Sequence, residues 1–265
     1  MKDALKVVGL ALTVAGITLA PQSASAYVNW WLGGCDTSSA THGNSCTYTG
    51  SDGTSQVTAS AWSNTNGGSL EAATLKEYSG GLGVINVNEG TADPNHAADN
   101  EGSIDVVLFD FSNLPNDAEV DLTNVFLGYY QDDSDISVLA YTGAGPMNLD
   151  GVDYTQAGMQ AAGWTTIGNY DVDFTDNTSP YNQPIATNVT SSYWLVGAYN
   201  PSFGACTVGT CQTSEPYRDY VKIQKLKGEL DIPPPPPPGV SEPGLLVLML
   251  GMTAPLAMRR RRKVH

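Results

Sequence analysis

Two groups of aspartates carry side chains that could bind a metal ion. The first group contains Asp132, Asp133 and Asp135, and the second contains Asp171, Asp173 and Asp176. Calcium takes about six to eight oxygen ligands, and closely spaced carboxylates supply several of them. Neither group has the EF-hand order, because the glycine at the sixth loop position and the glutamate at the twelfth are missing. The spacing leaves two interpretations open, a calcium site and a solvated Asp-rich turn.

His96 is the only histidine in the Asp-rich middle of the chain, and Asp99 and Asn100 follow it closely. A histidine paired with an aspartate can act as a general base or contribute to a metal site. The sequence has no G-x-S-x-G pattern for a nucleophile and no H-E-x-x-H pattern for a metalloprotease. We therefore expect His96 to fix the loop after a strand predicted at residues 81–87, with Asp99 and Asn100 in a turn.

Carbohydrate chemistry is a further possibility, in two forms. A glycosidase needs two carboxylates that face each other at about 5 to 9.5 Å, but acids are so numerous here that many pairs could be proposed. Exposed tryptophans could instead stack on sugar rings, and Trp30, Trp31 and Trp62 are candidates. Trp164 and Trp194 lie in apolar runs and are expected in the core. The sequence thus favours a protein that is not an enzyme.

The four cysteines form two local pairs in the sequence. Cys35 and Cys46 lie near the beginning of the chain's central part, and Cys206 and Cys211 near its end. An even number of cysteines in an exported protein predicts disulfides, and we expect each residue to bond to its near neighbour. Three connectivities are formally open. A zinc site is the alternative, although the tight Cys-x2-Cys spacing of most structural zinc sites is missing.

The central part of the chain is strongly acidic. All of the 27 acidic residues except Asp3 and Glu242 lie between residues 27 and 232, whereas only five of the 12 basic residues do, so this segment has a formal charge of −20. Such a charge repels phosphate backbones and argues against nucleic-acid binding. It attracts divalent cations and basic partners. Its content of Val, Ile, Leu, Tyr and Trp is too high for a disordered chain.

Short β-like runs separated by Gly, Asn, Asp and Pro clusters predict an all-β fold for residues 27–232. The predicted strands cover residues 56–62, 81–87, 104–111, 120–128, 136–141, 164–174, 193–199 and 219–226. One short helix is expected at residues 155–162. The number of strands and the spacing of turns favour two packed antiparallel sheets, as in a β-sandwich or jelly roll.

The first 26 residues have the features of a secretory signal peptide. Lys2 and Lys6 precede an apolar run, and the small residues Ala24, Ser25 and Ala26 follow it as a cleavage site requires. The apolar run is shorter than the roughly 20 residues that span a bilayer. We therefore expect signal peptidase to cleave after Ala26, which leaves Tyr27 as the first residue of the exported protein.

The C-terminal residues have the order of a linker, a motif, a membrane segment and a basic end. Residues 233–238 are six prolines, which form a stiff polyproline II rod of about 3.1 Å per residue within a linker at 233–239. Residues 244–258 are about 15 uncharged, mostly apolar residues, and a basic cluster would hold the end in the cytoplasm. This cluster consists of Arg259, Arg260, Arg261, Arg262 and Lys263.

This tail resembles the PEP-CTERM sorting signal of exported bacterial proteins. The resemblance rests on Val240, Ser241, Glu242 and Pro243, followed by the apolar segment and the basic cluster, so that the signal occupies residues 240–265. Ser241 stands where the first proline of the motif is usual. The resemblance implies a transmembrane helix that is temporary and an exosortase as the processing enzyme. The Leu-Pro-x-Thr-Gly motif of sortase substrates is missing from the sequence.

A second resemblance covers about residues 55–142. The order of Gly81-Leu82-Gly83-Val84, then His96 with Asp99-Asn100, then a pair of strands with an Asp-rich turn, resembles a family of exosortase-dependent surface proteins. The family implies export and sorting to the surface, and no particular reaction.

These observations predict a non-enzymatic surface or extracellular-matrix protein with a structural or adhesive role. Its expected partners are signal peptidase, an exosortase-like enzyme and surface polysaccharide. The expected cofactor is none, with calcium as the alternative. Two other functions stay open, a calcium-stabilised carbohydrate-binding module and a secreted enzyme that acts on glycosides.

Overall fold

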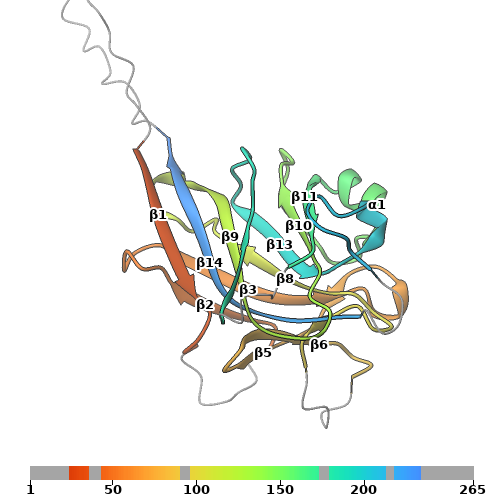
Figure 1. The fold of residues 1–265 in the computed structure, drawn as a ribbon. Helices are drawn as coiled ribbons and strands as arrows, with labels where there is room; N and C mark the ends of the chain where they lie inside the picture. The colour runs from red at the N-terminus through yellow and green to blue at the C-terminus, as the bar shows by residue number, and fades with distance from the viewer. Residues whose placement is uncertain (1–23, 36–42, 90–95, 173–178, 213–217, 234–265) are drawn as a thin grey trace, which may run out of the picture. The chain divides into compact units, whose positions relative to one another are not determined.

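The computed structural model describes residues 24–35, 43–89, 96–172, 179–212 and 218–233, which belong to one compact unit (Figure 1). Two seven-stranded sheets make up most of this unit, and all pairings between its named strands are antiparallel. The predicted all-β fold with two antiparallel sheets is confirmed. The signal peptide and the C-terminal helix lie outside the described residues.

The first sheet, sheet A, is built around its last strand, β14, which has 14 residues, as many as β9. It contains β1 (Ala24–Trp31), β5 (Thr74–Tyr78), β6 (Gly81–Ile85), β7 (Ala98–Asp99), β9 (Glu119–Asp132), β12 (Tyr181–Pro184) and β14 (Asp219–Ile232). One edge of β14 pairs with β9 from end to end, and its other edge pairs with β7, β6 and β1 in turn. The strand order is β12-β9-β14-β6-β5, with β1 and β7 also on β14.

The second sheet, sheet B, has the strand order β11-β10-β13-β8-β3-β2, with β4 paired to β3. Its strands are β2 (Ser45–Thr49), β3 (Gln56–Ser63), β4 (Glu71–Ala72), β8 (Asp105–Asp110), β10 (Ile136–Tyr141), β11 (Trp164–Tyr170) and β13 (Tyr193–Ala198). Short helices lie in the connections, namely η1 (Thr65–Gly67), η2 (Pro115–Asp117), α1 (Gln156–Ala161) and η3 (Pro201–Phe203).

The main core lies between the inner faces of the two sheets. It draws on alternate residues of β3, because successive side chains of a strand point to opposite faces. In β9 the alternation is broken once, between Leu122 and Val125, where the register with β14 shifts. Strand β8 differs in being buried on both faces. Val107 and Phe109 enter the main core, whereas Val106 and Leu108 enter a smaller core on the other side of sheet B.

The smaller core is covered by α1 and the loops around it. Thr155 caps this helix, since its hydroxyl accepts a hydrogen bond from the Gly158 N–H at 3.2 Å. Met159 is the buried residue of the helix, and it packs in the same cluster as Trp164. The predicted helix at residues 155–162 is thus confirmed to within one residue at each end. Trp164 and Trp194 are 2% and 0% exposed, as expected of core residues.

The lysines of β14 face outward because of an irregularity in the strand. The register with β9 shifts between Ile223 and Lys225, which inserts Gln224 as an extra residue. Lys222 and Lys225 are three residues apart and would otherwise point to opposite faces. Ile223 and Leu226 both remain in the main core, so the two lysines share the outer face of sheet A with Lys227.

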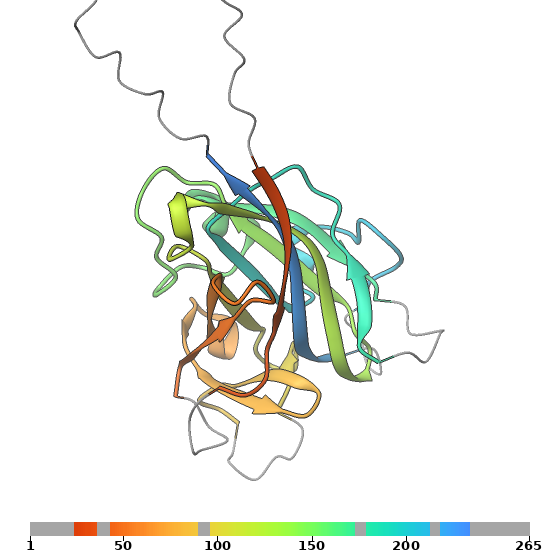
Figure 2. The same cartoon turned by 90° about the vertical axis from the view of Figure 1, so that its left-hand side faces the viewer.

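Strand β1 runs antiparallel to the last eight residues of β14, with Ala24 opposite Ile232 and Trp31 opposite Lys225. Figure 2 shows β1 in red beside β14 in blue, so the first and last described strands end at the same side of the unit. Ala24 and Ala26, the residues of the predicted cleavage site, are the first and third residues of β1. Tyr27 is paired with Glu229 inside the ladder.

Candidate functional site

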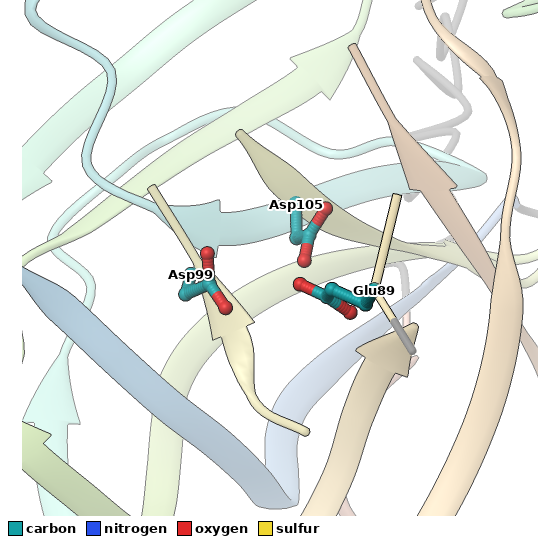
Figure 3. A group of neighbouring side chains, drawn as sticks. All are labelled: Glu89, Asp99 and Asp105. Carbon is teal, nitrogen blue, oxygen red and sulfur yellow. The ribbon is translucent and has the colours of Figure 1, made fainter. Parts of the chain in front are cut away.

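The first carboxylate cluster consists of Glu89, Asp99 and Asp105. Glu89 follows β6, Asp99 ends β7 and Asp105 begins β8. One carboxylate oxygen from each residue lies within 4.8 Å of the others, and Figure 3 shows the three groups directed toward one another. Asp105 is 0% exposed and Asp99 is 6% exposed, so two of the three carboxylates are enclosed by protein.

Hydrogen bonds hold two sides of this cluster. The Asn86 side-chain amide donates to Glu89 Oε1 at 3.0 Å and to Asp105 Oδ1 at 3.4 Å. The Glu101 N–H donates to Asp99 Oδ1 at 2.9 Å. Asp105 Oδ2 is different, because it makes no hydrogen bond of ordinary geometry with any described residue.

The electrostatics of the first cluster favour protons or a bound cation. Burial raises the pKa of Asp99 to about 8, against the Glu101 hydrogen bond, and the charge of Glu89 raises it further. Burial also raises the pKa of Asp105 well above its usual range, with the charges of Asp99 and Glu89 as further causes. Three carboxylates so close together cannot all stay ionised without positive charge nearby.

The second carboxylate cluster consists of Asp133, Asp135 and Asp219. Their nearest carboxylate oxygens also lie within 4.8 Å of one another. Asp219 begins β14, and its Oδ1 accepts a hydrogen bond from the Asp135 N–H at 2.8 Å. Asp135 Oδ2 accepts a hydrogen bond from the Gln212 N–H at 2.9 Å, whereas no donor of the described residues reaches its Oδ1.

Burial has the same effect on the second cluster. It raises the pKa of Asp219 to about 9, and the charges of Asp135 and Asp133 add to the effect. Burial also raises the pKa of Asp135 to about 7, although the hydrogen bond from Gln212 opposes the shift. Asp171 lies close enough for its charge to raise the pKa of Asp133 and Asp135.

Asn100 connects the two clusters. It follows Asp99 of the first cluster, and its side-chain amide donates to Asp219 Oδ2 at 2.5 Å. In return its Oδ1 accepts a hydrogen bond from the Asp219 N–H at 3.1 Å. His96 is 2% exposed, and its Nδ1 lies 3.9 Å from Glu89 Oε2. The residues singled out as His96, Asp99 and Asn100 therefore lie at one region of the fold, where both carboxylate clusters form.

The structure places the sequence candidates for calcium as follows. Asp133 and Asp135 come together, and Asp219 is their third partner. Asp132 is exposed at the end of β9, with φ 60°, and lies outside the group. Asp173, Asp176 and the sorting residues from Val240 onward fall outside the described residues.

Sequence reasoning missed Glu89, Asp105 and Asp219. The sequence contains a signal for two of them, because Asp105 and Asp219 are acidic residues at the start of strands that are rich in apolar residues. The structure shows that both positions are buried. No local pattern shows which distant acids will meet there.

Both disulfides have the predicted connectivity. Cys35 bonds to Cys46 and Cys206 to Cys211, with Cα–Cα distances of 6.2 and 5.4 Å. No free cysteine remains, so the alternative of a cysteine zinc site is wrong. The segment that contains the second disulfide also supplies N–H groups to acids, since Thr210 donates to Asp171 Oδ2 at 3.0 Å.

The outer face of sheet A carries a lysine-aromatic strip. It consists of Lys222, Lys225 and Lys227 with the rings of Tyr27, Trp31, Tyr78, Phe126 and Tyr129. The ammonium of Lys222 lies 4.3 Å from the Tyr78 ring centre and 4.0 Å from that of Tyr129. These contacts are short enough for cation-π attraction, and they bury all but 5% of Lys222.

The other two lysines of the strip are more accessible. Lys225 lies 3.6 Å from the Phe126 ring centre and 4.9 Å from that of Trp31. Lys227 lies 4.7 Å from the Tyr27 ring centre. Trp31 and Tyr27 are 54% and 60% exposed, so their rings remain open to solvent. Burial lowers the pKa of Lys225, and the charge of Lys227 adds to this effect.

Two of the pockets on the described surface each have one acidic residue in their wall. One, of about 360 Å³, is lined by Trp31, Glu77 and Tyr78 among others, at the edge of the strip. The other, of about 400 Å³, is lined by Glu119, Tyr141 and Tyr193 among others. A pair of carboxylates facing each other across open space is not present in either pocket.

Comparisons with known proteins gave no relative. The chain matches no family model, no curated protein and no solved structure. Within the residues that the structure describes, no helix has the length and apolar character needed to cross a lipid bilayer.

Proposed function

We propose that this chain is an exported, non-catalytic protein of the cell surface or extracellular matrix, and that it adheres to polysaccharide through the lysine-aromatic strip. In this proposal signal peptidase removes residues 1–26. The C-terminal helix holds the protein in the membrane until an exosortase-like enzyme processes the tail at the motif that contains Glu242 and Pro243.

The observation that carries the adhesive role is the position of the lysines. Residues 27–232 have a formal charge of −20, yet four of their five basic side chains lie over aromatic rings of sheet A. Rings with exposed faces stack on sugars, and ammonium groups bind carboxylates of acidic sugars. A polysaccharide with carboxylate groups fits this strip, whereas the remaining acidic surface would repel it.

Two further observations support export and a non-catalytic role. Disulfides form and persist in oxidising compartments, and this chain has two. The carboxylate clusters are largely buried, and their oxygens are closer together than the carboxyl groups of a glycosidase, which are about 5 to 9.5 Å apart. Of the three candidate functions, a secreted enzyme that acts on glycosides therefore has the least support.

Affinity electrophoresis of the full-length chain, in gels that contain alginate or neutral dextran, tests the adhesive role. We expect retardation by alginate, weaker retardation by dextran, and loss of the alginate effect at high salt. Replacement of Trp31 by Ala should weaken binding at least tenfold, because it removes an exposed ring beside Lys225. Tyr130→Ala is the control, since Tyr130 is exposed on the same sheet but packs beside Tyr181.

Equal mobility of the wild-type protein and Trp31→Ala in alginate gels would contradict the adhesive role. Stronger retardation by dextran than by alginate would contradict the part assigned to the lysines.

A calcium-stabilised carbohydrate-binding module is the second candidate function. The second carboxylate cluster favours it, because Asp133 and Asp135 were candidate calcium ligands on sequence grounds and Asp219 adds a third carboxylate. In a module of this kind calcium would fix the start of β14, the strand that carries the lysines.

A further inference from the structure

We propose that the first carboxylate cluster is a calcium site in which Glu89, Asp99 and Asp105 are the protein ligands. The site is separate from the Asp-rich turn at residues 132–135. It goes beyond the proposed adhesive function, because it does not depend on whether the lysine-aromatic strip binds polysaccharide.

The spacing of the oxygens fits a calcium ion. Calcium binds oxygens at about 2.3 to 2.6 Å, so two ligand oxygens on opposite sides of the ion are up to about 5 Å apart. The carboxylate oxygens of the cluster lie within 4.8 Å of one another. Magnesium binds at about 2.0 to 2.1 Å and needs a tighter arrangement. The three ligands supply only oxygen, which is the donor that hard cations prefer.

Two buried oxygens at the cluster provide an observation that is independent of its acidity. Asp105 Oδ2 and Ser63 Oγ make no hydrogen bond of ordinary geometry among the described residues, although both side chains are 0% exposed. Ser63 stands opposite Asp105 in the pairing of β3 with β8, and its hydroxyl lies near enough to favour the charged form of Asp105. Unpartnered buried oxygens are costly, and a cation would satisfy them.

The three ligands come from separate segments, and their positions suggest what the ion does. Glu89 ends the described loop after β6, Asp99 belongs to sheet A through its pairing with Tyr220, and Asp105 belongs to sheet B. An ion held by all three would tie the two sheets together at one end of the sandwich. It would replace the repulsion between three carboxylates with attraction to a common charge.

Isothermal titration of the full-length chain in mild detergent with CaCl₂, after removal of metal, tests the site. We expect Asp105→Asn to abolish one equivalent of calcium binding or to weaken it at least tenfold. The affinity should resemble that of extracellular calcium modules, with a Kd of about 0.1 to 1 mM. Asp150→Asn is the matched control, because Asp150 is exposed in a loop outside both clusters, and it should leave binding unchanged.

Further variants make the result decisive. Glu89→Gln changes a ligand whose side chain is 19% exposed, so it tests the site even if Asp105→Asn fails to fold. Asp135→Asn assigns any equivalent that belongs to the second cluster. Unchanged calcium binding in a folded Asp105→Asn or Glu89→Gln protein would overturn the proposal. So would loss of all calcium binding in Asp135→Asn alone, or tighter binding of magnesium than of calcium.

Discussion

Asp99 and Asp219 show how the fold changes the chemistry of single residues. Each begins with an ordinary carboxyl pKa of 3.8, and burial raises the pKa of Asp99 to about 8 and that of Asp219 to about 9. The cause is the loss of hydration of the charged form, which neighbouring carboxylates make worse. In the absence of metal the folded protein therefore holds these protons more tightly than the unfolded chain does.

This difference predicts how stability depends on pH. Because the folded pKa values are raised, the unfolded chain releases its protons first as the pH rises from about 4, and the folded state loses stability until about pH 9. We expect the metal-free protein to melt at a higher temperature at pH 5.5 than at pH 8.5. Calorimetry in calcium-free buffer measures the melting temperature at each pH. A melting temperature that rises over this range would contradict the prediction.

Asp135→Asn is a useful variant for the same measurement. In the wild-type protein, Asp135 Oδ1 accepts no hydrogen bond from a described residue. The asparagine side chain has nearly the same shape as aspartate, so the substitution would remove a buried charge and keep the packing. The variant should be more stable than the wild-type protein in metal-free buffer at pH 8, by about 1 to 3 kcal/mol, with a smaller dependence on pH.

Single residues were only partly predictable from the sequence. The resemblance and the local spacing identified His96, Asp99, Asn100, Asp133 and Asp135 as candidates, and the structure places all of them around the two clusters. Asp219 was not recognised, because it lies 84 residues after Asp135 and meets it only through the pairing of distant strands. Local spacing records neighbours along the chain, whereas carboxylate clusters form between strands.

Gly83, the second glycine of the Gly81-Leu82-Gly83-Val84 run, lies where β6 packs closely against the segment that contains β7. A Cβ atom on Gly83 would lie 2.2 Å from the carbonyl oxygen of His96, far inside contact distance. The two segments are also joined by a hydrogen bond from the Val84 N–H to the Ala97 carbonyl at 3.4 Å. Gly83 therefore allows the backbone at residues 96–99 to lie against β6, which positions Asp99.

Gly83→Ala should separate these two elements. Because the neighbouring atom is backbone and cannot turn away, we expect a loss of about 2 to 4 kcal/mol in the free energy of unfolding. Urea denaturation measures it. Gly145→Ala is the matched control, since a Cβ there would meet only the Tyr141 hydroxyl, at 3.9 Å. If Gly83→Ala unfolds within 0.5 kcal/mol of the wild-type protein, about the scatter of neutral surface changes, the close contact is not important.

The strands that the sequence predicted are the ones with strong apolar content, such as β8, β10 and β13. Six strands were missed, namely β1, β2, β4, β5, β7 and β12. Ser45–Thr49 is mostly polar, Tyr181–Pro184 is a short strand that ends in proline, and β4 and β7 have only two residues each. Such strands form because they pair with neighbouring strands, and the residues of the strand itself do not predict that pairing. The extra residue at Gln224 could not be predicted either, because it arises from the pairing of β14 with β9. It places Lys222 and Lys225 on the same face of the sheet.

At the scale of the whole molecule, the first and last strands of the described unit are neighbours. The core residues nearest the two ends are Val28 and Trp30 of β1 and Leu230 of β14. Removal of residues before Tyr27 would take three pairs from the ladder between β1 and β14, those of Ala24 to Ala26, but no core residue. The five remaining pairs, from Tyr27 to Trp31, keep β1 attached to β14. Cleavage after Ala26 is thus compatible with this fold.

The same reasoning gives the last prediction, which concerns the ends of the mature protein. We expect the protein recovered from its native host to begin at Tyr27 and to end near Pro243, because the expected signal-peptidase site ends at Ala26 and the sorting motif contains Glu242 and Pro243. Intact mass spectrometry measures both ends at once. An N-terminus beyond Val28 would contradict the pairing of β1 with β14, since it would remove a buried residue of that strand. A protein that still ends at His265 would contradict processing by an exosortase-like enzyme and leave a tail-anchored envelope protein instead.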